Sequence, residues 1–327
     1  MHSRKKSATQ IDMEPRHDSV LMNEVLSALA IQPSDTVVDA TLGGGGHFAA
    51  LLAALGEGGT IVGIDADLAA VERGREVYAR DRRPERPVAN LVNDNFRNLT
   101  RVLERLGVAP VDAILFDLGW SGYQIAAPRG FSFQNDEPLL MTYGEGSQTA
   151  ADIINSSSEA ALADIIFVYG EERFARGIAR SIVAARSRER ILTTGALVAA
   201  INAGTPVWYH EQKIHQATKT FQALRIAVND ETGALREGLS AAISALAPGG
   251  RLAVISFHSI EDRIVKNVLR DAARAGPGSL LTKKPIVPSR AEILANRRAR
   301  SAKLRVFKRS AVHSEQSDSF IHALSYA

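Results

Sequence analysis

The feature that most constrains the fold is an alternation of short apolar runs with helical patterns across residues 36–117. Four apolar runs have the length and composition of buried strands: 36–40, 60–65, 88–93 and 111–117. The stretches between them have the apolar spacing of amphipathic helices. Strands that alternate with helices predict a doubly wound parallel sheet covered on both faces. The sequence therefore predicts an α/β, Rossmann-like domain.

The alternation stops over 121–225, where turn-rich stretches and helical patterns include no convincing strand. Helical patterns there cover 158–170, 171–187 and 194–204. The α/β rhythm then returns with a helix over 231–250, a strand over 251–258 and a helix over 259–274. In that last helix, Ser259 and Asp262 are spaced like a capping box. We predict an α/β domain formed by 17–120 and 226–309, interrupted by an inserted all-helical domain over 121–225. Residues 1–16 are expected to be a disordered leader and 310–327 a C-terminal tail.

Composition excludes several classes of protein. The chain has no cysteine, so disulfides, thiolate metal sites and a cysteine nucleophile are excluded. No apolar run approaches the ~18 residues of a membrane span, and the polar N-terminus lacks the apolar segment of a secretory signal. We therefore expect a cytoplasmic protein without membrane contact.

Positive charge is concentrated near the C-terminus. The whole chain carries a formal net charge of +3, yet residues 283–309 contain ten Lys or Arg against one acidic residue, Glu292. Such a basic block indicates a phosphate-rich partner, with a solvated surface as the alternative. Within it, 303–309 resembles a strand, with Leu304 and Val306 on one face and Phe307 on the other.

Four consecutive glycines, 43–46, lie between the first predicted strand and the following helix. A triphosphate-binding loop would end in Gly-Lys-Ser/Thr, but here His47 and Phe48 follow. A dinucleotide fingerprint would need a third glycine where Phe48 stands. Taken alone, the glycines also fit an ordinary tight turn.

Acidic residues at the strand ends favour a different ligand. Four aspartates end or follow the successive predicted strands: Asp39, Asp65, Asp94 and Asp117. Open α/β sheets bind ligands at this edge. A carboxylate at Asp39 would repel a pyrophosphate, whereas one at Asp65 can accept hydrogen bonds from both hydroxyls of a ribose. A cationic adenosine compound, S-adenosylmethionine, meets both demands; helix capping is the alternative role for these aspartates.

Seven strings resemble, in order, the motifs of the MraW/RsmH family: TLGGGGH, ILFDLGWSG, RGFSF, YGEERFARGIARSIV, TKTFQALRIAVNDE, LAPGGRLAVISFHSIEDRIVK and RARSAKLRVFKR. The resemblance covers roughly residues 17–309. It implies a class I methyltransferase sheet and S-adenosylmethionine-dependent methylation of the exocyclic N4 amine of a cytosine. The target would lie in the decoding region of small-subunit (16S) ribosomal RNA, met within the assembling small subunit.

The resemblance also assigns roles to residues. Gly45, Gly46 and His47 would contact the cofactor, Asp65 its ribose and Phe96 its adenine. Asp117 and Gln124 would line the place where cofactor and base meet, and the helical insert would be the substrate-recognition domain.

The sequence departs from the family at two places. Where the family usually has Gly-Pro-Leu-Asp-Met-Arg, this chain has Glu137-Pro-Leu-Leu-Met-Thr142, so that Leu140 and Thr142 replace an acid and a base. Trp120 and Gly122 also stand where Val and Ser are usual. These departures bear on the target more than on the reaction class.

Methylation of cytosine needs an acceptor for an amino hydrogen, and Asp117 is the candidate catalytic residue. The base must also leave its stack, and four aromatic residues beyond Asp117 are candidates for the stacking wall: Trp120, Tyr123, Phe131 and Phe133. Packing of the insert is the alternative role for Phe131 and Phe133. His258 could contact RNA, orient Asp117 or simply end a strand. We expect no metal, because the sequence lacks a metal-ligand spacing.

Three other functions stay open at this point. They are methylation of another RNA or of DNA, a catalytically weak RNA-binding assembly factor, and a nicotinamide dehydrogenase, which the missing glycine and Asp39 disfavour.

Overall fold

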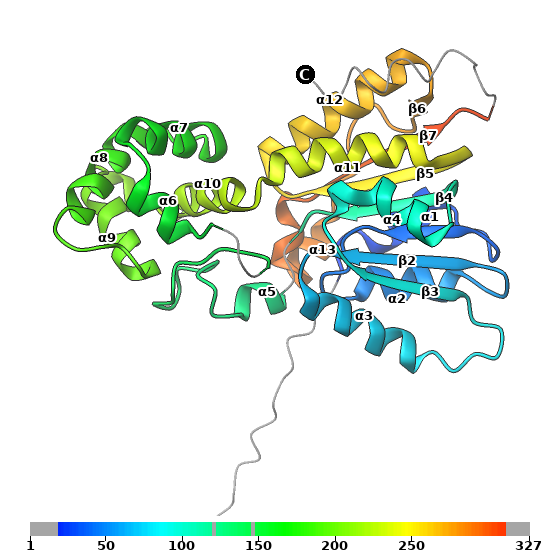
Figure 1. Ribbon diagram of the computed structural model, residues 1–327. Helices are drawn as coiled ribbons and strands as arrows, with labels where there is room; N and C mark the ends of the chain where they lie inside the picture. Colours follow the sequence, from blue (N-terminus) through cyan, green and yellow to red (C-terminus); the bar gives the residue numbers. More distant parts are fainter. Residues whose placement is uncertain (1–18, 120–121, 145–147, 312–327) are drawn as a thin grey trace, which may run out of the picture.

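The computed structural model describes residues 19–119, 122–144 and 148–311 (Figure 1). Seven strands form one sheet in the order β3-β2-β1-β4-β5-β7-β6. Their bounds are β1 Thr36–Asp39, β2 Thr60–Asp65, β3 Val88–Asn93, β4 Val111–Asp117, β5 Leu246–Ser256, β6 Gly278–Leu280 and β7 Lys303–Arg309. Strands β1 to β5 run parallel to one another, and β7 is antiparallel to its two neighbours, β5 and β6. The prediction of a doubly wound α/β sheet is confirmed.

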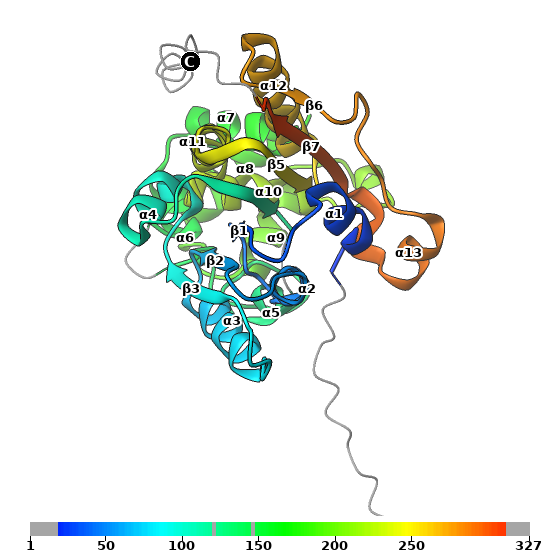
Figure 2. The same ribbon diagram turned by 90° about the vertical axis from the view of Figure 1, so that its right-hand side faces the viewer.

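Helices cover both faces of the sheet (Figure 2). One hydrophobic core lies under α4 (Leu99–Leu106), α11 (Glu231–Ala245) and α12 (Ser259–Ala275). The other lies under α1 (Met22–Leu29), α2 (Gly46–Ala54) and α3 (Leu68–Arg80). Successive strand residues face opposite cores, as pleated strands require.

Strand β7 shows this alternation and confirms the strand expected at 303–309. Leu304 and Val306 pack into the core under α1 to α3, whereas Phe307 packs into the core under α11 and α12. The strand is therefore buried on both faces, which explains why its apolar residues do not share one side.

The predicted helix over 231–250 is too long, because α11 ends at Ala245 and the Pro-Gly-Gly sequence belongs to β5. Leu246 already has an extended backbone, with φ −61° and ψ 138°. Arg309 donates from Nη1 to the carbonyls of Ser244 and Leu246, both at 2.7 Å, and so satisfies acceptors at the helix end.

Residues between β4 and α11 form short helices with a core of their own (Figure 1, left). The elements are α5 Gly122–Ala126, α6 Ala150–Ser156, α7 Glu159–Gly170, α8 Ala175–Arg186, α9 Thr194–Ala203, the 3-10 turn η2 Val207–Tyr209 and α10 Thr218–Asn229. The helix predicted over 171–187 starts only at Ala175, because Glu171 adopts a left-handed conformation (φ 49°) that ends α7. Helix α10 runs across residue 225, so the exact boundary of the insert stays a prediction.

The remaining elements are short. They are η1 Phe96–Asn98, α13 Arg290–Ala295 and η3 Arg297–Ser301. In the described parts of the chain, we find no helix with the length and apolar character needed to cross a bilayer.

Candidate active site

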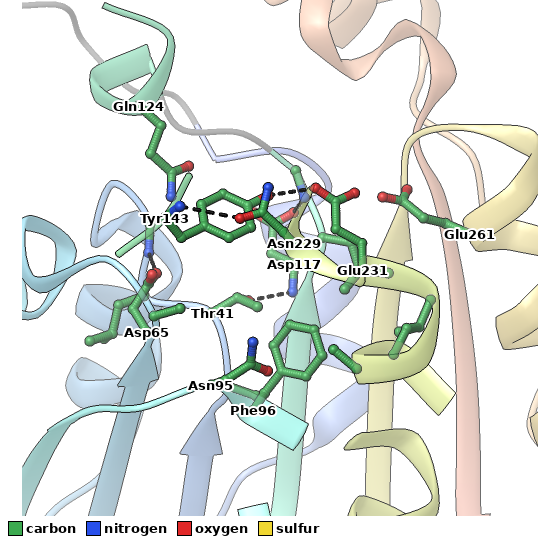
Figure 3. A pocket seen from close by; sticks show the side chains of 18 of the residues that line it. Thr41, Asp65, Asn95, Phe96, Asp117, Gln124, Tyr143, Asn229, Glu231 and Glu261 are labelled. Carbon is green, nitrogen blue, oxygen red and sulfur yellow. Dashed lines mark hydrogen bonds between the residues drawn. The ribbon is translucent and has the colours of Figure 1, made fainter. Parts of the chain in front are cut away.

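A pocket opens at the carboxyl ends of β1, β2 and β4, where the strand order changes direction between β1 and β4 (Figure 3). This is the position at which doubly wound sheets bind ligands. The turn after β1, the ends of β2 and β4 and the start of η1 line one side. Residues of α10, α11 and α12 line the other.

The glycine turn brings bare backbone to the pocket. Gly43, Gly44 and Gly46 line it, whereas Gly45 does not. Gly45 instead caps α2 with φ +81°, and a Cβ there would lie 3.3 Å from the Val77 side chain. Its N–H donates to the carbonyl of Leu42 at 2.7 Å. Gly45 therefore sets the shape of the turn, and its neighbours present the backbone.

Asp39 is a buried carboxylate with an unused oxygen. Its side chain is fully buried, Oδ1 accepts the N–H of Thr41 at 3.1 Å, and Oδ2 has no hydrogen-bond partner. Burial raises the pKa of Asp39 to about 7, although the charge of His47 and the Thr41 N–H both lower it. Asp39 does not line the pocket, although its neighbours Ala40 and Thr41 do. Its carboxylate therefore acts on a pocket ligand only through space, where its negative charge, when ionised, favours a cation.

Asp65 is held by backbone donors at the end of β2. Its Oδ2 accepts the N–H of Gly43 and its Oδ1 the N–H of Asp67, both at 2.8 Å. Burial raises the pKa of Asp65 to about 6, and the two N–H groups oppose that rise. Because each oxygen keeps a second lone pair, the carboxylate can still accept hydrogen bonds from a ligand.

Asp117 ends β4 and also borders the pocket. Its backbone N–H donates to Oγ1 of Thr41 at 2.7 Å, and its Oδ1 accepts the N–H of Gly119 at 3.3 Å. Its Oδ2 lies 3.2 Å from Nδ1 of His47. The opposite ring nitrogen of His47, Nε2, lies 3.1 Å from the carbonyl oxygen of Val20.

Phe96 and Gln124, the other residues assigned by resemblance, both line the pocket (Figure 3). Phe96 begins η1, and its ring meets Phe116 edge-on at 5.3 Å between centroids. Gln124 is buried and reaches the pocket from α5. The structure thus brings to the pocket every residue assigned by resemblance except Gly45.

Sequence reasoning missed three residues on the side of the insert: Tyr143, Asn229 and Glu231. The Tyr143 hydroxyl donates to Oε1 of Glu231 at 2.8 Å, and its backbone N–H donates to Oδ1 of Asn229 at 3.2 Å (Figure 3). Burial, and then the charge of Glu231, raise the pKa of Tyr143 well above its usual value. Asn229 and Glu231 belong to TKTFQALRIAVNDE, one of the seven family-like strings. Membership of that string is the sequence signal that could have identified them as site residues.

A charged cluster adjoins these residues on the side of the pocket lined by α10, α11 and α12. Nη2 of Arg225 lies 2.8 Å from Oε2 of Glu231 and 3.9 Å from Oε1 of Glu261. His258 Nε2 lies 2.9 Å from Glu261 Oε1 and 3.4 Å from Arg225. Glu231, His258 and Glu261 have the mutual spacing of metal ligands, a grouping the sequence did not reveal. The guanidinium already supplies the positive charge there, and the absence of a metal stays a prediction.

His258 does not orient Asp117. It is the N-cap of α12, and it forms a capping box with Glu261. The capping pair predicted at Ser259 and Asp262 is therefore wrong by one residue. Asp262 instead pairs with Lys303 and Arg305 at 2.9 and 2.8 Å.

Asp94 and the predicted aromatic wall also differ from expectation. Asp94 accepts hydrogen bonds from Asn95, Asn98 and Arg101 and does not line the pocket. The N-cap of η1 is Asn95. Phe131 stacks on Tyr143, and Phe133 contacts His215 and Phe221, so both pack within the insert. Tyr123 lies under the guanidinium of Arg73. Trp120 is outside the described residues.

The segment that departs from the family pattern is partly explained. Glu137 is buried, and its Oε2 accepts the N–H of Gly130 at 3.1 Å. Leu140 lies at the surface and Thr142 is half-buried. The acid at 137 thus has a local structural partner.

A doubly wound sheet with a glycine turn and acidic strand ends around one pocket defines an α/β protein that binds a nucleoside-type cofactor. The chain belongs to the MraW methylase family, whose family model matches residues 14–310. It is 47% identical over 309 residues to the ribosomal RNA small subunit methyltransferase H of Deinococcus radiodurans, covering 93% of this chain and 94% of the relative. It is 45% identical over 312 residues to the protein of that name from Syntrophotalea carbinolica, covering 90% and 98%. The resemblance seen in the motifs is confirmed.

The solved structure of an rRNA methylase from Streptococcus thermophilus overlaps with a TM-score of 0.41 at 12% identity, covering 88% of this chain and 93% of that one. An overlap at this level carries no argument about function.

Proposed function

We propose that this protein transfers a methyl group from S-adenosylmethionine to the N4 amine of a cytosine in the decoding region of small-subunit (16S) ribosomal RNA. Membership of a methylase family and the names of the relatives support the reaction class and the RNA. The observation that carries the proposal is the position of Asp117, whose carboxylate borders the pocket that we assign to a cationic adenosine ligand.

The residues present fit the methyl donor. Asp39 lies beside the lining residues Ala40 and Thr41, so its negative charge favours an ammonium or sulfonium through space, and Asp65 suits the two hydroxyls of a ribose. The backbone of Gly43, Gly44 and Gly46 gives room for the amino-acid part, and the Phe96 ring offers an apolar surface for adenine. When bound, S-adenosylmethionine supplies an activated methyl group on its sulfonium.

The protein's own contribution is to place the acceptor. The amino lone pair of cytosine is delocalised into the ring, which makes it a poor nucleophile. An ionised Asp117 that accepts one amino hydrogen localises that lone pair and fixes the direction of attack. Alignment of this kind contributes much of the rate of a group transfer.

The cytosine must leave its stack to reach Asp117. Tyr143 is the described aromatic side chain on the insert side of the pocket, and it forms hydrogen bonds to Asn229 and Glu231. Of these two bonds, only the one from the hydroxyl to Glu231 holds the ring, whereas Asn229 holds the Tyr143 backbone. We assign Tyr143 as a wall for the flipped base in place of Phe131 and Phe133.

The basic block supports a phosphate-rich partner. Six of its residues are exposed: Lys283, Lys284, Arg290, Arg297, Arg298 and Arg300. We propose that these side chains contact rRNA phosphates within a partly assembled small subunit, in the cytoplasm. The helical insert would recognise the substrate.

A different RNA or DNA target is the second candidate, because Leu140 and Thr142 replace a charged pair of the family pattern. A catalytically weak assembly factor would keep the fold but need not keep Asp117 beside the donor pocket.

Mass mapping of small-subunit rRNA tests the proposal. RNA from a deletion strain should lack one methyl group on a decoding-region cytosine, and the wild-type gene should restore it. Restoration by Asp117→Ala would refute the catalytic assignment. An unchanged rRNA mass pattern with methylation found on another nucleic acid would favour the second candidate.

A further inference from the structure

His47 is buried, and both of its ring nitrogens face hydrogen-bond acceptors. Nε2 lies 3.1 Å from the carbonyl oxygen of Val20, which can only accept, so Nε2 carries a proton. Nδ1 lies 3.2 Å from Oδ2 of Asp117. An ionised carboxylate also only accepts, so the geometry calls for a second proton on Nδ1. The ring satisfies both neighbours only as an imidazolium.

We propose that His47 is a positioning residue, which as an imidazolium held by Val20 fixes the Asp117 carboxylate for the acceptor amine. This role is distinct from contact with the methyl donor. It leaves Oδ1 of Asp117, which has one N–H from Gly119, as the oxygen that can accept from a substrate amine.

The surroundings restrict Asp117 in the same direction. A Cβ at Gly119 would lie 2.5 Å from the Phe257 ring and 3.1 Å from Oδ1 of Asp117, so only glycine allows this close approach. Thr41 holds the Asp117 backbone. With His47 on Oδ2, the carboxylate is fixed at its backbone and at both oxygens.

The charges that face His47 favour its protonation. They come from Asp117 on β4 and Asp39 on β1. Burial would lower the pKa of His47, but the hydrogen bond and charge of Asp117, the charge of Asp39 and the Val20 carbonyl together raise it above its usual value. The imidazolium therefore persists below this raised pKa. As the pH rises through it, Nδ1 loses its proton and turns a lone pair toward the carboxylate.

Two amide substitutions at His47 test its hydrogen bond to Asp117 separately from its hydrogen bond to Val20. In His47→Asn the amide nitrogen takes roughly the place of Nδ1 and can still donate to Asp117. In His47→Gln it takes roughly the place of Nε2, keeps a donor for Val20 and leaves Asp117 without one. Neither amide titrates between pH 5 and 9.

Single-turnover methyl transfer at saturating donor should fall by about 10²-fold in His47→Gln, the usual effect of a misplaced reacting group, and much less in His47→Asn. Wild-type rates should decline on the alkaline side, and His47→Asn should lack that decline. His210→Asn is the matched control, since His210 contacts Thr205 in the insert and does not line the pocket. Equal losses in both His47 variants with an unchanged pH profile would overturn the proposal.

The kinetic part rests on the proposed function, so a second readout avoids substrate. Long-range proton–nitrogen spectra of the histidine-labelled full-length apoprotein report the protonation of each ring nitrogen, and His47→Asn assigns the signal. We expect His47 to titrate above the ordinary histidine pKa and to titrate lower in Asp117→Asn. A His47 pKa at or below the ordinary histidine value, or a titration that ignores Asp117→Asn, would overturn the proposal whatever the enzyme methylates.

Discussion

The two sides of the pocket differ in how far their charges are balanced. On the strand-end side, Asp65, Asp117 and His47 line the pocket, and Asp39 is buried beside them with one oxygen that has no partner. On the helical side, formed by Arg225, Glu231, His258 and Glu261, a guanidinium lies among the acids. The strand-end side therefore has more acidic than basic groups, which favours a cationic ligand. The second side is satisfied by itself and ties the insert to the sheet domain.

Removing Asp117 should have the largest effect of any single change. We expect Asp117→Ala to lower methyl transfer to small subunits by about 10³-fold or more, because the amine loses its acceptor. Labelled methyl incorporation measures this, with circular dichroism to verify the fold. Asp94→Ala is the matched control: it removes another carboxylate that follows a strand but bonds to Asn98 and Arg101 outside the pocket, so activity should persist. Full activity of Asp117→Ala would contradict the assignment.

Removing the cation of the helical side should mainly lower the free energy of unfolding. Arg225→Met leaves Glu231 and Glu261 without their cation, and loss of one member of a buried pair costs about 3–5 kcal/mol of unfolding free energy. Urea or thermal unfolding measures the loss. Adding Glu231→Gln to Arg225→Met should recover part of it. A loss below ~0.5 kcal/mol would show that the cluster behaves as an exposed ion pair and that the comparison fails.

Asp39→Asn should stabilise the apoprotein, in contrast to the loss of stability expected for Arg225→Met. Because burial raises the pKa of Asp39 to about 7 from 3.8, the folded state holds its proton more tightly than the unfolded state. The stability contributed by this group therefore falls as pH rises from about 4 through 7. At pH 8 we expect Asp39→Asn to stabilise the apoprotein by up to about 4 kcal/mol, with little effect at pH 4. The same variant should bind the donor more weakly. Lower stability at pH 8 would contradict an unpaired buried charge.

The smallest effects concern the basic block. Arg297→Ala or Arg300→Ala should each lower the slope of log affinity against log salt for rRNA by about 0.7–0.9, because each is exposed and proposed to contact one phosphate. Arg305→Ala is the contrast, since Arg305 already pairs with Asp262 within the fold. That variant should lose stability and keep the slope. Equal slopes in all three variants would contradict the proposal that the basic block contacts RNA.

The sequence predicts the sheet well because a buried strand and an amphipathic helix each have a local period. The strands at 60–65, 88–93 and 111–117 have the bounds expected of them. The error at α11 arises because Pro-Gly-Gly usually ends a helix, whereas here the chain has already entered β5 before it. The helix end depends on Arg309, a residue 64 positions away from Ala245 along the chain.

The sequence predicts site residues that lie within a single motif, but it does not predict contacts between distant motifs. Asp65, Asp117 and the glycine turn are visible in the sequence because each follows a strand. The partner of Asp117 is not, since no spacing indicates whether His47 or His258 lies beside it. Tyr143 and Glu231 meet across 88 residues of sequence, and only the folded chain brings them together.

Calorimetric titration of the purified protein with S-adenosylmethionine at pH 6 and pH 8 tests the central claim most directly. Burial places the pKa values of Asp65 and Asp39 at about 6 and about 7, so both carboxylates are ionised only at the higher pH. We predict one donor per chain, bound at least tenfold more tightly at pH 8. No heat at millimolar donor, with or without small subunits, or equal affinity at both pH values, would contradict a pocket built from strand-end carboxylates.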